Sequence, residues 1–308
     1  MFSLPSSAKK QLPYIALAFV CVFWGTTYLA MRVGLRSISP YWIMGLRNSA
    51  AGIILVSYFL FKGHKIPTGA SLRRILITGI IILFIGGGLQ AYAVQFLPSG
   101  LAALIFSLVP FWILLINLLI NPSEKTNATI LSGLALGFAG QLFVFLGHLN
   151  DFGKISGLQG LIAIIFATLF WSLGTVYGKK KKHDAHPLFA AGIQMFVSGF
   201  MFDGVAFFSH GKFSVATIPH EAWIALVYLT VVGSLMGYSA YIFALSKLTA
   251  TEVSVTAYVN PIIAIIAGTV LLGEEFTVST FVALALTVAG VILINKKIHS
   301  KKKKLGTV

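Results

Sequence analysis

The sequence predicts an all-α integral membrane protein, and three observations lead to this fold class. Of the 308 residues, 57% are hydrophobic and only 10% are charged, whereas a soluble chain carries about 25% charged residues. The charges are clumped between long apolar runs, and the two halves of the chain share a pattern of residues. We therefore expect ten transmembrane helices, arranged as two inverted five-helix repeats around a central cavity.

Ten apolar runs follow one another along the chain, each close to the roughly 20 residues that a helix needs to cross the hydrocarbon core of a bilayer. They cover 13–33, 41–61, 73–96, 99–120, 128–147, 157–178, 188–209, 222–246, 252–272 and 278–295. Lys9 and Lys10 precede the first run, as in a signal peptide. That run is longer than a typical h-region and ends at no small-residue cleavage site, so we expect a permanent span.

The basic residues predict the orientation, because cytoplasmic loops carry an excess of Lys and Arg. With a cytoplasmic N-terminus, 18 of the 23 basic residues lie in inside segments, 4 lie in outside segments, and Arg47 lies within a span. Both termini are therefore expected to be cytoplasmic. The Lys-rich tail 297–308 then anchors the topology, and binding to anionic lipid is the alternative interpretation of this tail.

An internal repeat divides the chain into a first half, 12–150, and a second half, 155–296. Phe23–Trp24 recurs at Phe170–Trp171, 147 residues later, and the same offset relates Arg47 to Gln194. Further on, the segment 86–110 matches 237–261 at an offset of 151, with a proline closing both segments. Each half holds five spans, an odd number, so the second half must enter the membrane from the opposite side. Inverted repeats of this kind build secondary transporters.

These features together resemble the EamA-type members of the drug/metabolite transporter (DMT) superfamily. The shared features are the "FWG" of the first span, the proline and arginine around the second, and the prolines in spans 4 and 9. The resemblance implies that spans 1–4 and 6–9 surround a central cavity while spans 5 and 10 lie at the periphery. It also implies export of small metabolites, often amino acids, across the bacterial inner membrane.

Aromatic and hydroxyl side chains interrupt the first span in a repeated pattern. Trp24, Thr27 and Tyr28 are spaced i, i+3 and i+4, which places them on one helix face. Trp171 occupies the equivalent position in the second half, and both tryptophans lie far from the span ends where interfacial anchoring occurs. We expect these residues to line the central cavity, and helix packing is the alternative.

Two charged residues lie within spans, and such residues usually face a cavity or a partner. Arg47 is a candidate contact for a substrate carboxylate, and the alternative is a structural arginine that caps carbonyls or extends to the interface. Asp203 is a candidate for proton coupling. The two lie at similar depth, which makes an Arg47–Asp203 ion pair an additional hypothesis.

Amides, tyrosines and prolines within the apolar runs complete the candidate site. An unpaired amide is expensive in hydrocarbon, so we expect the following residues to face inward: Gln90, Tyr92, Gln95, Tyr238 and Tyr241. Asn260, beside Pro261, is a further candidate polar contact for the substrate. Pro110 and Pro261 each remove a backbone N–H in mid-span, and we interpret them as hinges. The alternatives are helix–helix hydrogen bonding for the polar groups and inert kinks for the prolines.

The leading hypothesis for function is a secondary transporter that exports small metabolites such as amino acids by alternating access. An intramembrane enzyme or a lipid-modifying protein is the alternative, and it would need catalytic carboxylates or histidines at membrane depth. We expect no enzymatic activity, cofactor or metal, because no such cluster or ligand spacing is present. The expected partners are a small-molecule substrate, the lipid bilayer and a coupling proton. Nucleic acid is not expected, and the pattern favours no particular oligomeric state.

Overall fold

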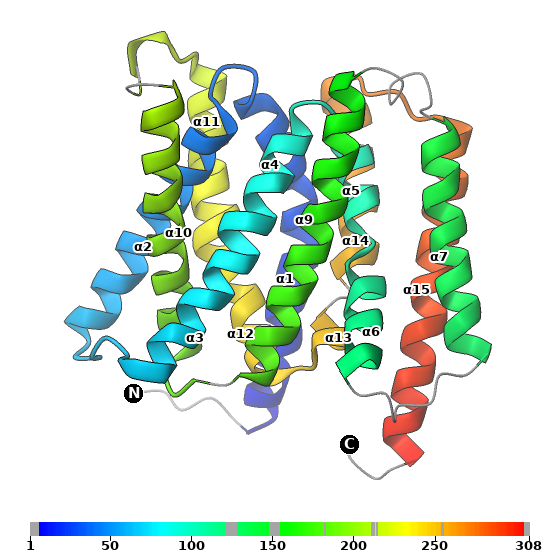
Figure 1. Cartoon of the computed structure of the whole chain (residues 1–308), viewed down its shortest axis with the longest axis horizontal. Coiled ribbons are helices and arrows are strands. Elements are labelled where there is room, and N and C mark those ends of the chain that lie inside the picture. The colour runs from blue at the N-terminus through cyan, green and yellow to red at the C-terminus, as the bar shows by residue number, and fades with distance from the viewer. Residues whose placement is uncertain are drawn as a thin grey trace.

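The chain folds into a bundle of helices in a computed structural model (Figure 1) that describes residues 6–120, 128–147, 155–181, 183–210, 213, 215–253 and 256–304. Every element in these ranges is helical. The first half contains α1 (Ser6–Gly34), α2 (Pro40–Phe61), α3 (Gly69–Gly79), η1 (Ile80–Gly87), α4 (Gly88–Val94), α5 (Ser99–Phe106), α6 (Val109–Ile120) and α7 (Ala128–Gly147). The second half contains α9 (Ile155–Lys180), α10 (Pro187–His210), η2 (Val215–Thr217), α11 (His220–Tyr228), η3 (Leu229–Tyr238), α12 (Ser239–Lys247), α13 (Ala250–Val253), α14 (Thr256–Leu272) and α15 (Val278–Lys304).

Each of the ten predicted apolar runs falls on helix in the described residues. By length and composition, seven continuous stretches of these residues are long and apolar enough to cross a membrane, and shorter apolar helices cover Val259–Leu272 and Val278–Gly290. The predicted basic tail begins within α15, which continues to Lys304, and residues 305–308 lie outside the described part. The connection at 121–127 also lies outside the described part.

The helices of the two halves pack against each other in pairs. α2 lies along α10, α1 lies along α14, and α9 packs against η1 and α4. α7 and α15 pair with each other at one edge of the bundle (Figure 1), as the resemblance implies for spans 5 and 10. Small residues permit these close contacts: a Cβ atom at Gly52 or Gly199 would collide with the backbone of the facing helix.

Both halves contain a π-helical segment inside a longer helix. η1 continues α3 into α4, and η3 continues α11 into α12. η1 ends at Gly87 and η3 ends at Tyr238, which are 151 residues apart, the offset of the sequence repeat. A π-helical turn widens the helix locally, and such turns are frequent at functional sites.

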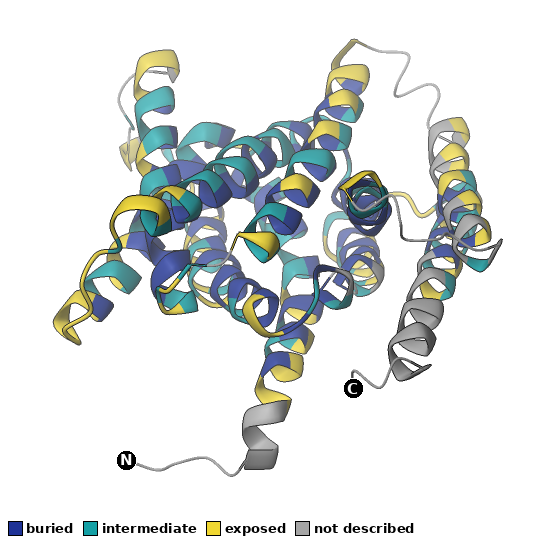
Figure 2. Ribbon diagram, turned by 60° about the horizontal axis from the view of Figure 1, so that its bottom comes forward, coloured by how far each residue is buried: buried dark blue, intermediate teal, exposed yellow. Residues whose placement is uncertain are grey.

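Large apolar side chains cover the outer surface, as a bilayer requires. Phe61, Phe208 and Leu119 are at least 80% exposed, which is costly in water and favourable in lipid. Figure 2 shows the buried residues on the inner faces of the helices and the exposed residues on the outer faces and at helix ends. The described part of the chain is therefore built as a multi-pass membrane protein.

One carboxylate links the two halves at the face opposite the termini. The backbone N–H and the hydroxyl of Ser99 both donate to the Glu274 side chain at 2.8 Å, and the N–H of Gly100 donates to it at 3.2 Å. Ser99 and Gly100 begin α5, where the first backbone N–H groups have no partner within the helix. A negative charge at that end also complements the helix dipole.

Candidate functional site

A cavity of about 80 Å³ lies at the centre of the bundle and is lined from both halves. Space of this size has room for several water molecules. The first half contributes α1, α2, the η1–α4 segment, α5 and α6, and the second half contributes α9, η3, α12 and α14. Eight of the nine residues predicted to bind substrate are among its lining residues: Trp24, Thr27, Tyr28, Arg47, Gln90, Trp171, Tyr241 and Asn260.

Three aromatic rings from different helices form one wall of the cavity. The ring centroids of Trp24 and Tyr241 lie 5.2 Å apart, and those of Trp24 and Trp171 lie 5.5 Å apart at nearly a right angle. The indole of Trp171 donates to the hydroxyl of Tyr241 at 3.2 Å. The indole of Trp24 donates to the carbonyl of Gly233 at 3.1 Å. These bonds pair the polar edges of the rings, and the rings pack on one another to form an apolar part of the cavity wall.

Arg47 provides the positive charge of the cavity. Its Nε donates to the hydroxyl of Ser234 at 2.8 Å, across the contact between α2 and η3. Among the described residues, Arg47 forms no ion pair with a carboxylate. A guanidinium in a small, largely dehydrated cavity interacts strongly with an anion, and its planar fork suits a carboxylate.

Two asparagines on the cavity wall each carry a buried polar atom without a hydrogen-bond partner. Asn48 accepts from Ser234 through Oδ1 at 2.9 Å, while its Nδ2 has no partner. Asn260 is 8% exposed, and its Oδ1 has no partner. Buried polar groups are nearly always paired in folded proteins, so these two atoms are exceptions within the described residues. The cavity thus presents an unpaired amide donor beside Arg47 and an unpaired acceptor on α14.

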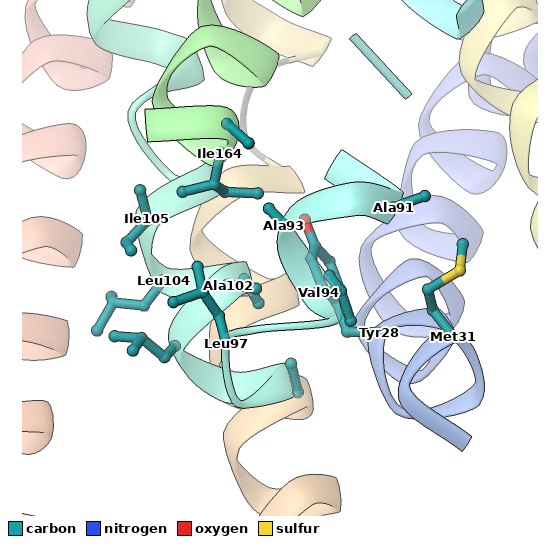
Figure 3. Close-up of a cluster of buried hydrophobic side chains, with 14 of the residues drawn as sticks. Tyr28, Met31, Ala91, Ala93, Val94, Leu97, Ala102, Leu104, Ile105 and Ile164 are labelled. Carbon is teal, nitrogen blue, oxygen red and sulfur yellow. The ribbon is translucent and has the colours of Figure 1, made fainter. Parts of the chain in front are cut away.

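Tyr28 joins the cavity to the largest hydrophobic cluster. Figure 3 shows Tyr28 and Met31 of α1 facing Ala91 and Val94 of α4. The cluster extends from Ile38 in the α1–α2 connection to Leu114 in α6.

The remaining predicted residues lie outside the central cavity or at its border. Tyr92 is not among the lining residues, and its ring packs on Phe96 with centroids 5.1 Å apart. Asp203 lies where α10 meets α2, accepts from the hydroxyl of Ser49 at 2.6 Å, and has a second carboxylate oxygen without a partner. The hypothesis of an Arg47–Asp203 ion pair is therefore wrong, because Arg47 faces η3 and Asp203 faces a different side of α2.

The two prolines occupy different positions in their helices. Pro261 lies inside α14 and lines the cavity. Pro110 was expected in mid-span, but the span is broken at Ser107–Leu108, and Pro110 belongs to the first turn of α6. Proline is well tolerated in a first helical turn, where the missing N–H would have no partner.

Several lining residues were not predicted from the sequence. They are polar or aromatic side chains next to predicted ones: Asn48, Phe106, Ser107, Ser234 and Thr256. Asn48 follows Arg47 directly, and Ser234 lies within the π-helical segment η3. A polar residue inside an apolar run was the available signal for most of them.

The fold and this cavity define a class of protein. It is a multi-pass helical membrane protein with a small aromatic and polar cavity at its centre, and helices from two similar halves line that cavity. The sequence model of the EamA-like transporter family matches this chain twice, over residues 11–146 and 158–296. The chain therefore belongs to the EamA-like transporter family, within the DMT superfamily.

Named relatives support the same assignment over the full length. The inner membrane transporter YedA of Escherichia coli K12 is 31% identical, over 93% of this chain and 92% of YedA. A probable amino-acid metabolite efflux pump of Escherichia coli K12 is 26% identical, over 89% of this chain and 91% of the pump. A solved crystal structure shares the fold with a TM-score of 0.69 and 17% identity, covering 94% of this chain and 98% of that chain. The names of these relatives indicate transporters and not enzymes.

Proposed function

We propose that this protein is a secondary transporter that exports small zwitterionic metabolites, such as amino acids, across the bacterial inner membrane. The observation that carries the proposal is the arrangement of unpaired groups in the central cavity. Arg47 and the Nδ2 group of Asn48 lie together as donors, and Asn260 offers an acceptor. A carboxylate suits the two donors, Arg47 and Asn48, and an ammonium group suits the acceptor oxygen of Asn260.

The aromatic wall suits the side chain of such a solute. Trp24, Trp171 and Tyr241 line the same cavity and pack on one another, and ligand sites are commonly apolar with a few placed polar groups. The relative named as a probable amino-acid metabolite efflux pump agrees with this chemistry.

Alternating access is the mechanism we propose, with ten spans formed by two inverted repeats and both termini in the cytoplasm. The double family match, the π-helical segments at repeat-related positions and the excess of basic residues in the expected inside loops support this arrangement. Two similar halves around one site can rock about it, which exposes the site to each face in turn. Asp203 is the proposed site of proton coupling.

Efflux from proteoliposomes tests the proposal. A metabolite-resistance screen in cells that express the protein would select candidate solutes, and each would then be loaded as a radiolabelled compound into vesicles with the purified protein. We expect zwitterionic amino acids to leave faster than from protein-free vesicles. If no solute leaves faster, with or without a pH gradient, the transporter proposal fails.

A further inference from the structure

Two helix ends meet at the corner between α4 and α5, on the face of the bundle opposite the chain termini (Figure 1). α4 ends at Val94 and α5 begins at Ser99, so the α4–α5 corner covers residues 94–99. The last carbonyls of a helix and its first N–H groups have no partner within that helix. At this corner both kinds of group bond to charged side chains from elsewhere in the chain.

Arg32 of α1 bonds to the end of α4. Its Nη1 atom donates to the carbonyls of Val94 and Gln95, both at 2.7 Å. A cation at the C-terminal end of a helix also complements the helix dipole. Val94 lines the central cavity, and so does Met31, which precedes Arg32 in the chain. These bonds therefore lie at the edge of the central cavity.

Glu274, in the α14–α15 connection, bonds to the start of α5 through the N–H groups of Ser99 and Gly100 and the Ser99 hydroxyl. Gly273 has a φ of +66°, a conformation that favours glycine. The N–H of Glu274 donates back to the carbonyl of Gly268 at 3.1 Å. A Cβ atom on Gly268 would collide with the Glu274 carboxylate. The two glycines thus allow this carboxylate to reach the start of α5.

Both charged residues belong to one pair of packed helices. α1 lies along α14, and a Cβ atom at Gly25 of α1 would collide with Ile263 of α14. Arg32 lies in the last turn of α1, and Glu274 follows the end of α14. The α1–α14 pair lines one part of the central cavity, and α4 and α5 line another. The charged residues therefore join two sides of the cavity at the face opposite the termini.

The sequence repeat places a similar bond at the other face. Arg32 corresponds to Lys179 at the offset of 147, and Val94 corresponds to Leu245 at the offset of 151. The ammonium group of Lys179 donates to the carbonyl of Leu245 at 2.9 Å, in the last turn of α12. In each half, a basic side chain near the end of the first long helix thus bonds to the end of the α4 or α12 segment.

The carboxylates at the two corners differ in origin. At the start of α13, Glu252 accepts from the N–H and the hydroxyl of Thr249 at 2.7 Å, so this carboxylate belongs to the helix that it caps. At the start of α5, the carboxylate comes from the other half of the chain. The α4–α5 corner is therefore held from the α1–α14 pair by a cation and by an anion.

We propose that the α4–α5 corner is a gate of the central cavity, and that Arg32 and Glu274 hold this gate closed at the face opposite the termini. This inference rests on the proposed function, because alternating access requires the cavity to open to each face in turn. Opening toward this face would break the bonds of both charged side chains, and water would replace them at the two helix ends.

A thiol in the central cavity tests the gate. Cys21 is the only cysteine, so Cys21→Ser gives a background in which Ser107→Cys is the single thiol. Ser107 lines the cavity and is 1% exposed. Its modification by the membrane-impermeant trimethylammonioethyl methanethiosulfonate is measured in vesicles that present the face opposite the termini. Ala216→Cys in the α10–α11 connection and His64→Cys in the α2–α3 connection, exposed on opposite faces, report the orientation of the vesicles.

We expect Arg32→Gln and Glu274→Gln each to speed this modification by about tenfold, because a hydrogen bond to a charged group contributes at least that factor. The two substitutions change the local charge in opposite directions. A purely electrostatic effect on the cationic reagent would therefore raise one rate and lower the other. Arg36→Gln and Glu275→Gln are the matched controls, because they make the same charge changes at exposed residues, and they should leave the rate unchanged.

Gly268→Ala tests the role of Glu274 without a change in charge. The added Cβ atom should displace the carboxylate from Ser99, so modification should speed up as it does in Glu274→Gln. An unchanged rate in Gly268→Ala would assign the effect of Glu274→Gln to charge and overturn the role of Glu274.

Modification from the other face distinguishes a gate from a loosened protein. In vesicles that present the face with the termini, Arg32→Gln and Glu274→Gln should react no faster than the native background. Equal acceleration from both faces would indicate general destabilisation and overturn the gate. The gate is also overturned unless both substitutions raise the rate from the face opposite the termini, and raise it more than their matched controls do.

These measurements are independent of solute flux. Unchanged rates in Arg32→Gln and Glu274→Gln would overturn the gate even if the protein exports amino acids. Absence of efflux from proteoliposomes, with the thiol results as expected, would overturn the proposed function and leave the gate of the cavity in place.

Discussion

The guanidinium of Arg47 donates from Nε to the hydroxyl of Ser234, which in turn donates to Oδ1 of Asn48. A Cβ atom on Gly233 would lie 2.8 Å from an Nη atom of Arg47, so the glycine leaves room for the guanidinium. The chain of bonds joins α2 to η3 and fixes the guanidinium at the cavity wall. Neither Nη group bonds to a described residue, which leaves both for a solute.

Removing either tryptophan of the aromatic wall should impair transport more than insertion. A buried Trp→Ala change costs about 3–5 kcal/mol of stability, so Trp24→Ala and Trp171→Ala will lower the amount of protein. We expect transport per inserted molecule to fall by a further factor of about ten, because the ring faces that contact the solute are lost. Quantitative blotting and efflux from the same vesicles measure both effects.

Trp112 offers a matched control for this experiment. It is half-buried and donates to the hydroxyl of Thr168 at 3.0 Å, but it does not line the cavity. Trp112→Ala should lower the amount of protein and leave transport per molecule unchanged. Equal losses of transport per molecule in all three variants would mean that the wall has only a packing role.

Substitution of Asn260 should remove recognition of the ammonium group. The unpaired Oδ1 atom is the acceptor we assign to that group, and a hydrogen bond to a charged group contributes about 1.5–3 kcal/mol. The native protein should therefore prefer phenylalanine over 3-phenylpropionate by at least about tenfold in counterflow. Asn260→Leu should abolish the preference, and Asn260→Asp should keep it. A preference that survives in Asn260→Leu would exclude this role.

Asp203 is expected to carry the coupling proton. Its carboxylate has one hydrogen bond, from Ser49, and one buried oxygen without a partner. The native protein should accelerate efflux when a pH gradient is applied, and Asp203→Asn should lose this acceleration while keeping counterflow. Efflux measured across a pH series checks this. An unchanged pH dependence would remove Asp203 from the mechanism.

The two prolines should differ in their effects on turnover. Pro261 lies inside α14, where it removes a backbone hydrogen bond and crowds the preceding turn. Pro261→Ala should raise the melting temperature and lower the turnover number several-fold, because a continuous helix bends less. Pro110→Ala, in the first turn of α6, should change both quantities less. The hinge interpretation fails if Pro261→Ala leaves turnover unchanged.

The helices were predictable because a span must be both long and apolar. The ten apolar runs match helices in the described residues, since backbone groups in lipid have no partners outside the helix. The same constraint made most of the cavity residues predictable, because a polar side chain within such a run has to face a cavity or a hydrogen-bond partner. Trp24, Arg47 and Asn260 were found in this way, and the repeat drew attention to Trp171 and Tyr241.

The direction of a side chain around its helix was the part that sequence reasoning missed. The similar membrane depth of the two residues suggested an Arg47–Asp203 ion pair, but successive side chains on a helix point in directions about 100° apart around its axis. Ser49 therefore faces Asp203, while Arg47 and Asn48 face the cavity. The π-helical segments were also missed, because no residue pattern used in the sequence analysis predicts them.

Carboxylate selectivity is the most direct test of the central claim, that Arg47 binds the carboxylate of the exported solute. Counterflow of phenylalanine and of phenylalaninamide would be measured in native, Arg47→Gln and Arg36→Gln proteins. Arg36 is exposed in the α1–α2 connection and serves as the matched control. We predict that the native protein and Arg36→Gln favour phenylalanine by at least about tenfold, and that Arg47→Gln transports both solutes equally slowly. A preference for phenylalanine that persists in Arg47→Gln would contradict the account.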